Sequence, residues 1–238
     1  MFLRFFRLLR DFLLPACVLV AAGLLFSCAP SERVMSGRGG KVLAHDRNVR
    51  VLLCKTKEGV SLLSSDKIKI SEQKERYTFI SPGKRVYIRP ESVRRPLLVE
   101  SWNDPISVNG TRYRGSITLH NIAGSLYVIN SLKLNEYLYG VVPVEMPADW
   151  PVEALKAQAV AARTFALYHI MKQKNMLYDL DATTSSQVYK GLEAEKPSSN
   201  RAVDETKSII IAFEYEPIIS FFHSTCGGKT VDDSFVWH

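Results

Sequence analysis

The stretch YGVVPVEMPADWPVEALKAQAVAARTFALYHI, residues 139–170, decides much of the fold. Its second half is an alanine-rich run that follows Pro151, and proline is tolerated at the first position of a helix. Glu153 lies in that first turn, where the helix dipole favours negative charge. Small residues occur on almost every face of the run, so neighbouring backbone can approach it closely. We therefore predict a central, buried helix from Pro151 to about Met171.

A single carboxylate, Glu145, interrupts the apolar segment ahead of this helix, with Pro143 and Pro147 on either side. Loss of hydration disfavours the ionised form of a carboxyl group, and an acid that keeps its proton can act as a general acid. The residues therefore indicate a proton donor in the loop before the helix. The alternative is a surface glutamate that caps the helix from that loop.

Short strands are predicted from Val42 to about Asn135, because β-branched and aromatic residues alternate there between turn signals. Asn109–Gly110 and Gly124–Ser125 are the best hairpin candidates. The predicted strands are 48–53, 67–70, 76–80, 85–89, 113–120 and 125–130.

Helical signals dominate the rest of the chain. We expect a short helical turn at 134–139, the alanine-rich helix and a further helix at about 197–208. The apolar run 209–225 is interpreted as two buried strands that turn at Glu216–Pro217. Strands first and helices later predict an α+β fold, in which a mostly antiparallel β region packs with the central helix.

The composition is that of an ordinary globular protein, with 46% hydrophobic and 23% charged residues among 238. The net charge of +7 favours an anionic partner, but it does not choose among nucleic acid, lipid and acidic polysaccharide. The sequence contains no phosphate-binding glycine loop, and we expect no nucleic acid partner. The five histidines are scattered, so we expect neither a metal nor a cofactor.

The N-terminus predicts export. Three arginines precede an apolar stretch at 12–26, as in a secretory signal, and Ser27–Cys28 resembles a bacterial lipobox. We therefore expect residues 1–28 to be a signal peptide with Cys28 as the lipidation site, and residues 29–41 to be a flexible tether. An uncleaved membrane anchor is the alternative. Both place the chain on the outer side of the cytoplasmic membrane or in the periplasm.

A glycine-rich segment near the C-terminus, FFHSTCGGKT at 221–230, predicts a tight loop whose backbone amides can face a ligand. His223 could bind a sugar or assist proton transfer, or simply be a hydrogen-bonded loop residue. Cys226 lacks the partners of a cysteine nucleophile. A disulfide between Cys54 and Cys226 is permitted outside the cytoplasm, although the interpretation as free thiols is favoured.

These motifs resemble the bacterial stage II sporulation protein D and amidase-enhancer family. The hallmark segment stands nearly intact from Tyr137 through Ala166, with Phe165 where tyrosine is usual. The resemblance extends over roughly residues 113–237. Further matching motifs are YRG at 113–115, SQVYKG at 186–191 and FHSTCGGKT at 222–230.

Members of this family with known activity are lytic transglycosylases. They cleave the MurNAc–GlcNAc β-1,4 bond of peptidoglycan strands that an amidase has already stripped of stem peptides. The resemblance implies that Glu145 is the catalytic acid and base, and that a cell-wall amidase is a functional partner. The substrate-binding residues that we expect are Lys156, Gln158, Arg163, Gln187, Tyr189, His223, Ser224, Gly227 and Gly228.

Two of these residues suggest a preference for stripped strands. Lys156 and Arg163 are two helical turns apart and share a stripe, which is either a solvated edge or part of a groove. Removal of the peptide leaves a free lactyl carboxylate on each MurNAc, and a cationic groove would favour such a strand.

Departures from the family pattern shape the remaining expectations. Some members bind zinc through a Cys-x-x-x-His-Cys cluster, where this chain has Asp181, Ser185 and Ser186, so we predict no zinc. We expect a small β-rich region at 42–110 and the catalytic domain at 111–238, truncated at its C-terminus. The alternative function is a non-catalytic peptidoglycan-binding protein that recruits or stimulates an amidase.

Overall fold

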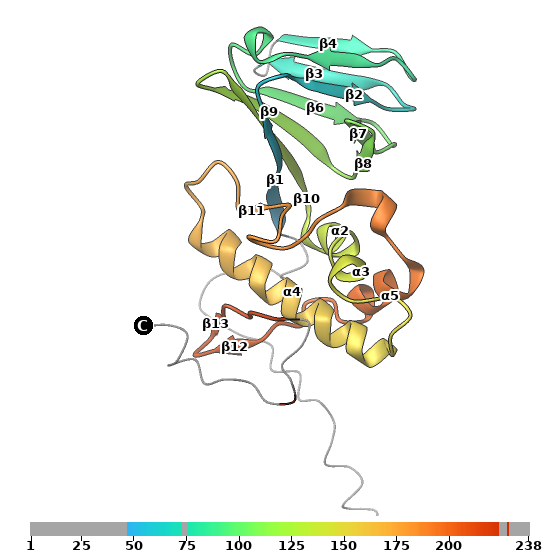
Figure 1. The fold of residues 1–238 in the computed structure, drawn as a ribbon, viewed down its shortest axis with the longest axis vertical. Coiled ribbons are helices and arrows are strands. Elements are labelled where there is room, and N and C mark those ends of the chain that lie inside the picture. The colour runs from blue at the N-terminus through green and yellow to red at the C-terminus, as the bar shows by residue number, and fades with distance from the viewer. Residues whose placement is uncertain (1–46, 73–75, 224–227, 229–238) are drawn as a thin grey trace, which may run out of the picture. The chain divides into compact units, whose positions relative to one another are not determined.

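The computed structural model describes residues 47–72, 76–223 and Gly228. The chain divides into two compact units, Met1–Lys41 and Val42–His238, and all described residues belong to the second unit. Within it, strands come first and helices follow, so the α+β prediction is confirmed (Figure 1).

Two sheets make up the strand-rich part. The strands of the larger sheet are β1 (Asn48–Thr56), β3 (Ile68–Glu72), β4 (Arg76–Ile80), β6 (Leu97–Ser101), β9 (Ser116–Ile122), β10 (Ser125–Lys133) and β11 (Leu180–Asp181). The strands of the smaller sheet are β2 (Val60–Leu63), β5 (Val86–Ile88), β7 (Ile106–Val108) and β8 (Thr111–Tyr113). The larger sheet has the order β11-β1-β10-β9-β6-β3-β4 and is antiparallel except for the β1–β11 pair. The smaller sheet has the order β5-β2-β7-β8.

Helices follow β10. They are α2 (Leu134–Tyr139), α3 (Val142–Glu145), α4 (Val152–Lys172) and α5 (Pro197–Glu205), with 3-10 turns η2 (Pro90–Ser92) and η3 (Gly191–Ala194). The predictions of α2 and of the long, buried α4 are confirmed, since Ala159, Ala162 and Ala166 of α4 have no exposed surface. In the described ranges, none of the helices combines the length and the apolar character that crossing a bilayer requires.

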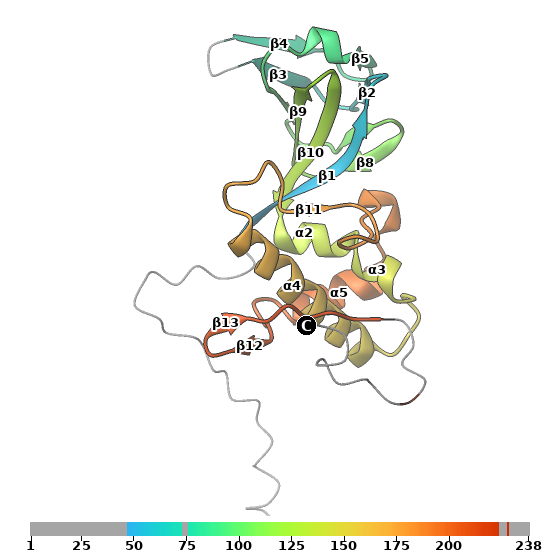
Figure 2. The same ribbon diagram turned by 60° about the vertical axis from the view of Figure 1, so that its left-hand side comes forward.

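The larger sheet carries the core on one face, which we call the inner face. Side chains alternate between the faces of a sheet, and Val51, Val99, Ile117 and Val128 all point to this face and are completely buried. The smaller sheet packs over the part that β6 and β9 provide. Helices α2, α4 and α5 pack over the ends of β1 and β10, as Figures 1 and 2 show from two directions.

The predicted strands occur with shifted ends, and 113–120 divides into β8 and the start of β9. Strands β2, β6 and β7 were not predicted. Asn109–Gly110 does form the β7–β8 turn, whereas the β9–β10 turn is Ala123–Gly124, with Ile122 opposite Ser125. All four turn residues have positive φ, which matches the twist of a two-residue hairpin.

Residue 110 is not a structural boundary. Strand β1 pairs along its length with β10, and the β7–β8 hairpin spans the predicted division. The predicted small β region and the predicted catalytic domain therefore share one sheet.

The interpretation of 209–225 as two buried strands is wrong. Strands β12 (Ala212–Phe213) and β13 (Glu216–Pro217) form a two-residue ladder that turns at Glu214–Tyr215. Phe213 is 70% exposed and Tyr215 is 83% exposed, because among the described residues no further layer covers this hairpin.

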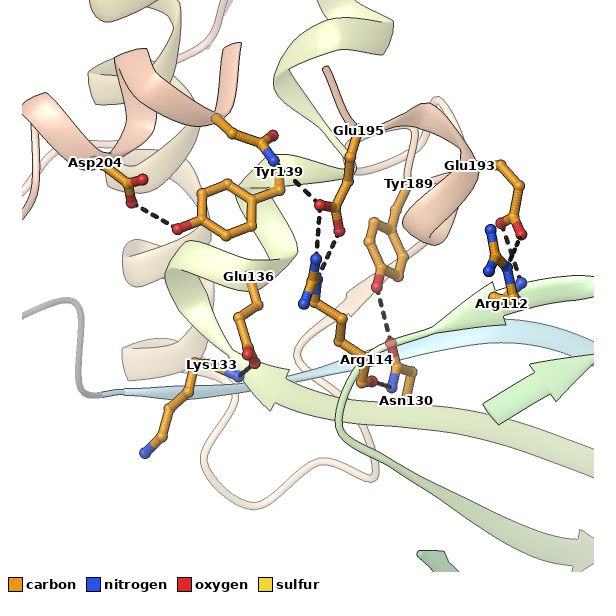
Figure 3. A network of polar contacts seen from close by, with 11 residues as sticks. Arg112, Arg114, Asn130, Lys133, Glu136, Tyr139, Tyr189, Glu193, Glu195 and Asp204 are labelled. Carbon is orange, nitrogen blue, oxygen red and sulfur yellow. Dashed lines mark hydrogen bonds and ion pairs between the residues drawn. The ribbon is translucent and has the colours of Figure 1, made fainter. Parts of the chain in front are cut away.

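Ion pairs join the sheets to the helical part, as Figure 3 shows. Arg112 Nε donates to Glu193 Oε1 over 2.8 Å, and Arg114 binds Glu195 through two hydrogen bonds of 2.7 and 2.9 Å. Gly191 lies between these pairs with φ +66°, and a Cβ there would come within 2.4 Å of the Arg112 carbonyl oxygen. Only glycine fits this close contact without strain.

Candidate functional site

Glu145 is the last residue of α3, not a loop residue, because its amide donates to the Val141 carbonyl oxygen over 3.1 Å and closes a helical turn. The side chain is partly exposed. Its Oε1 accepts a hydrogen bond of 2.9 Å from the backbone amide of Val188. The short helix and the loop that contains Val188 therefore hold the carboxylate between them.

The loop around Val188 is fixed by the side chain before it. Gln187 is almost completely buried, and its Oε1 accepts a hydrogen bond of 3.2 Å from the Tyr137 hydroxyl. Its Nε2 donates to the Ala162 carbonyl oxygen of α4 over 3.3 Å. Burial raises the pKa of Tyr137 well above its usual value, so the phenol stays neutral and remains a donor.

The side chain after Val188 fixes the loop in the same way. The Tyr189 hydroxyl donates to Asn130 Oδ1 over 3.0 Å, while Asn130 Nδ2 donates to the Arg114 carbonyl oxygen (Figure 3). Asn130 Nδ2 also donates to the Ser116 carbonyl oxygen. Burial raises the pKa of Tyr189 as well. Gly140 allows this arrangement, because a Cβ there would lie 2.6 Å from the Tyr189 ring.

A second segment reaches α4 at the same turn. Ser220 Oγ donates to the Ala161 carbonyl oxygen over 2.6 Å, next to the carbonyl that Gln187 uses. The Phe221 ring packs edge-on against Phe165 of α4. His223, which follows directly, is exposed. The structure thus brings the end of the 218–223 segment and the Glu145–Val188 pair to neighbouring sides of α4.

Several predicted residues fall in the part of the C-terminal segment that the structure does not describe. Ser224, Cys226 and Gly227 lie outside the described residues, as do Cys28 and the predicted signal peptide. Gly228 is exposed and has φ +93°, with open space where a Cβ would stand.

The prediction that Arg163 contacts the substrate is wrong in this structure. Arg163 is completely buried, and its guanidinium donates to the Val203 and Ile209 carbonyl oxygens and to Thr206 Oγ1 at 2.9–3.3 Å. Burial lowers its pKa to about 10. Arg163 therefore connects α4 to the end of α5 and cannot reach a polysaccharide.

Lys156 and Gln158 also differ from expectation. Lys156 Nζ lies 2.9 Å from both Glu153 Oε1 and Glu205 Oε2, so two carboxylates already neutralise its charge. Gln158 is 9% exposed, and its Nε2 has no hydrogen-bond partner among the described residues. Gln187 and Tyr189 are buried too, so these two predicted ligands position the Val188 amide and do not face solvent.

The sequence interpretation missed Tyr137 and Asn130 as parts of the site. Tyr137 belongs to the hallmark segment, and a tyrosine within an otherwise apolar run was the available signal. Asn130 ends a predicted strand, where nothing marked it as buried. Its partner Tyr189 is 59 residues away in the chain, a distance that local patterns cannot bridge.

Over the described ranges, no three His, Cys, Asp or Glu side chains form a group that could hold a metal ion. Asp181, at the position of a family zinc ligand, accepts hydrogen bonds from the hydroxyls of Thr183 and Ser186. Its carboxylate therefore stabilises the turn that leads into Gln187.

Comparison with known proteins gives the relationship. Residues 123–213 match the family model described as "Stage II sporulation protein". An uncharacterized protein of Brachyspira hyodysenteriae is 44% identical over 134 residues, which are 56% of this chain and 36% of the relative. The "Amidase enhancer" of Bacillus subtilis is 35% identical over 157 residues, which are 65% of this chain and 20% of the relative.

"Stage II sporulation protein D" of Bacillus amyloliquefaciens is 35% identical over 130 residues, which are 48% of this chain and 37% of the relative. The matched regions thus make up between a fifth and two fifths of these relatives. The family model covers the helical part that holds Glu145, Gln187 and Tyr189. Residues 123–213 of the chain are therefore similar to the family of stage II sporulation protein D and amidase enhancer.

Proposed function

We propose that the chain is a lytic transglycosylase that cleaves the MurNAc–GlcNAc β-1,4 bond of peptide-stripped peptidoglycan strands. The observation that carries the proposal is the geometry of Glu145. It is a partly exposed carboxylate at the end of a rigid helical turn, and the Val188 amide binds one of its oxygens at 2.9 Å. The match of residues 123–213 to the family model supports the same assignment.

The chemistry needs one carboxyl group that gives up a proton and takes one back. Protonated Glu145 donates to the glycosidic oxygen as the bond from that oxygen to C1 of MurNAc breaks. The C6 hydroxyl of the same MurNAc then attacks C1, and its proton returns to Glu145. The products are a 1,6-anhydro end and a strand with a free 4-hydroxyl. The substrate supplies the nucleophile, so the second carboxylate of most glycosidases is not required.

The surroundings of Glu145 suit this role. The Val188 amide takes up Oε1, while Oε2 accepts no hydrogen bond from the described residues, which leaves an oxygen for the substrate. The buried pair of Tyr137 and Gln187 fixes the Val188 amide from behind.

The test uses Glu145→Gln, because glutamine keeps an oxygen that can accept from the Val188 amide and loses only the transferable proton. Strands pre-treated with an amidase are incubated with each variant, and anhydromuramyl ends are measured by mass spectrometry. We expect product formation to fall by a factor of about 10² or more, in line with general acid–base catalysis. Glu153→Gln, the exposed acid in the first turn of α4, serves as the matched control. Equal rates in Glu145→Gln and the parent chain would refute the assignment.

A non-catalytic role is the alternative, and the printed name of the Bacillus subtilis relative, "Amidase enhancer", favours it. On that reading the chain binds stripped strands but releases no anhydromuramyl product. An amidase assayed with and without the chain would then show stimulation that Glu145→Gln does not reduce.

The proposed site of action is outside the cytoplasm, at the membrane. It rests on the arginine and apolar pattern of the first 28 residues and on Cys28, which lie outside the described residues. Radiolabelled fatty acid should enter the parent chain and not Cys28→Ala. Labelling of both, or of neither, contradicts lipidation at Cys28.

A further inference from the structure

The larger sheet has a second face, which we call the outer face, and neither the smaller sheet nor the helices that pack on the inner face cover it. Cross-strand register defines it: Phe79 of β4 lies opposite Lys69 of β3, which lies opposite Glu100 of β6. Farther along the sheet, Thr118 of β9 and Ser131 of β10 point to the same side. The inner-face residues between them, such as Val99, are completely buried.

Three aromatic rings lie exposed at one end of the outer face. We call them the aromatic cluster: Tyr77, Phe79 and Trp102, which are 57%, 43% and 60% exposed. The Tyr77 and Phe79 ring centroids are 5.2 Å apart, and those of Phe79 and Trp102 are 6.0 Å apart. Exposed rings that pack against each other in this way form a continuous apolar surface, which commonly marks a binding site.

Lysines accompany these rings. Lys67 Nζ lies 4.1 Å from the Phe79 ring centroid and 5.9 Å from that of Trp102. Lys69 lies 5.8 Å from the Tyr77 ring and 3.7 Å from Glu100. The strand-rich part of the sequence also carries an excess of positive charge. Residues 47–110 contain 13 Lys and Arg against 7 Asp and Glu, whereas residues 111–223 contain 11 against 12.

A hollow of about 490 Å³ continues the outer face from Trp102. It is lined mainly by polar groups, among them Asn103, Ser116 and Ser131. A second hollow of similar volume shares Ser131 and extends to Met176 in the loop after α4. The volume is within the usual range for ligand sites. A path thus extends from the aromatic cluster along the outer face, with mainly polar walls in the first hollow and more apolar walls, including Ile129 and Leu177, in the second.

We propose that the outer face is a second glycan-binding surface, which holds a peptide-free amino-sugar strand with carboxylate substituents. The aromatic cluster would stack on the apolar C–H faces of sugar rings. Lys67 and the net positive charge of the strand-rich part would attract the carboxylates, and the hydroxyls and amides of the hollow would bind N-acetyl and hydroxyl groups. This inference rests on the proposed function for the identity of the polymer.

Two other occupants fit the face less well. A second copy of the chain would bring two strand-rich parts of net positive charge together, which is unfavourable. A lipid surface is broad and flat, so it would leave the concave, polar part of the face empty.

The test measures binding separately from cleavage. Full-length chain with Glu145→Gln binds peptide-stripped strands in a calorimeter, so that the ligand is not consumed. Adding Phe79→Ala and Trp102→Ala removes two of the three rings, and we expect affinity to fall about 10-fold or more. Tyr87→Ala is the matched control, since Tyr87 is 55% exposed but lies on β5 of the smaller sheet.

Ligand comparison identifies the chemistry. Affinity for stripped strands should exceed affinity for chitin fragments of equal length and should fall with added salt, because only the stripped strand carries carboxylates. Unchanged affinity in the double variant, or equal loss in Tyr87→Ala, overturns the proposal. Two further results would overturn it. In each, the double variant keeps its affinity for the glycan but loses either binding to phosphatidylglycerol vesicles or self-association measured by sedimentation equilibrium.

Failure of this inference and failure of the proposed function give different results. With Glu145 intact, the double variant should show a raised KM and an unchanged kcat. If no variant forms anhydromuramyl product but the double variant still binds stripped strands more weakly, the proposed reaction is refuted and the glycan-binding role of the outer face is supported. If the double variant forms product with the KM of the parent chain, the proposed reaction is supported and the glycan-binding role of the outer face is refuted.

Discussion

The two parts of the described chain use their charged and polar side chains in opposite ways. In the helical part, Arg163 and Gln187 are buried and bind backbone carbonyl groups and a phenol, and Lys156 is neutralised by two glutamates. In the strand-rich part, Lys67 and Lys69 stand over exposed rings. Lys156 and Arg163, both on α4, thus serve the fold, and the excess positive charge lies on the other part of the molecule.

Arg163→Ala should produce the largest effect on stability. The substitution opens a cavity in the helical core and leaves the Val203 and Ile209 carbonyl oxygens without a donor, so we expect a loss of about 3 kcal/mol or more. Urea unfolding followed by circular dichroism measures it. Lys67→Ala, an exposed lysine of the strand-rich part, should stay within about 0.5 kcal/mol of the parent. Similar losses in both variants would remove the distinction between the two parts.

Gly191→Ala should have a smaller effect, at the joint between the parts. Its Cβ would collide with the Arg112 carbonyl oxygen at a positive φ, and we expect a loss of about 1–3 kcal/mol. Gly124→Ala isolates the backbone contribution, because Gly124 has φ +76° but open space around the added Cβ. If thermal melts show equal losses in the two variants, close packing at the joint is not what requires glycine.

The smallest effect concerns the two surface lysines. Lys156→Ala should change the affinity for stripped strands by less than about twofold, because its charge is already paired with Glu153 and Glu205. Lys67→Ala should weaken binding more, and it should reduce the dependence of affinity on salt. Titrations at two salt concentrations measure both. If Lys156→Ala lost more affinity for stripped strands than Lys67→Ala, the carboxylates would be bound by the helical part and not by the strand-rich part.

The sequence predicted the elements that local patterns specify. Helix α4 follows from its proline and alanine pattern, α2 from its short helical signal, and the β7–β8 turn from Asn109–Gly110. It did not predict that Arg163 is buried, because an arginine two turns from a lysine looks like part of a solvated stripe. Its burial depends on α5, whose carbonyl groups approach from 40 residues away.

The candidate site was predictable in its key residue and not in its supports. Glu145 stands out as a lone acid in an apolar segment, and the family resemblance adds Gln187 and Tyr189. Their positions behind the Val188 amide depend on Tyr137 and Asn130, which come from a helix and a strand outside that loop. The aromatic cluster depends on register between β3, β4 and β6, and β6 was not predicted at all.

The pairing of β1 with β10 has a practical consequence for fragment design. A polypeptide cut to the segment that the family model matches, 123–213, would lack Val49 and Val51, which help to close the helical core from the inner face. It would also leave the backbone groups along one edge of β10 and of β11 without hydrogen-bond partners, because β1 lies between these two strands and pairs with both. The recognisable segment is therefore smaller than the smallest autonomous folding unit, and excised pieces for crystallisation or assay should begin upstream of Asn48.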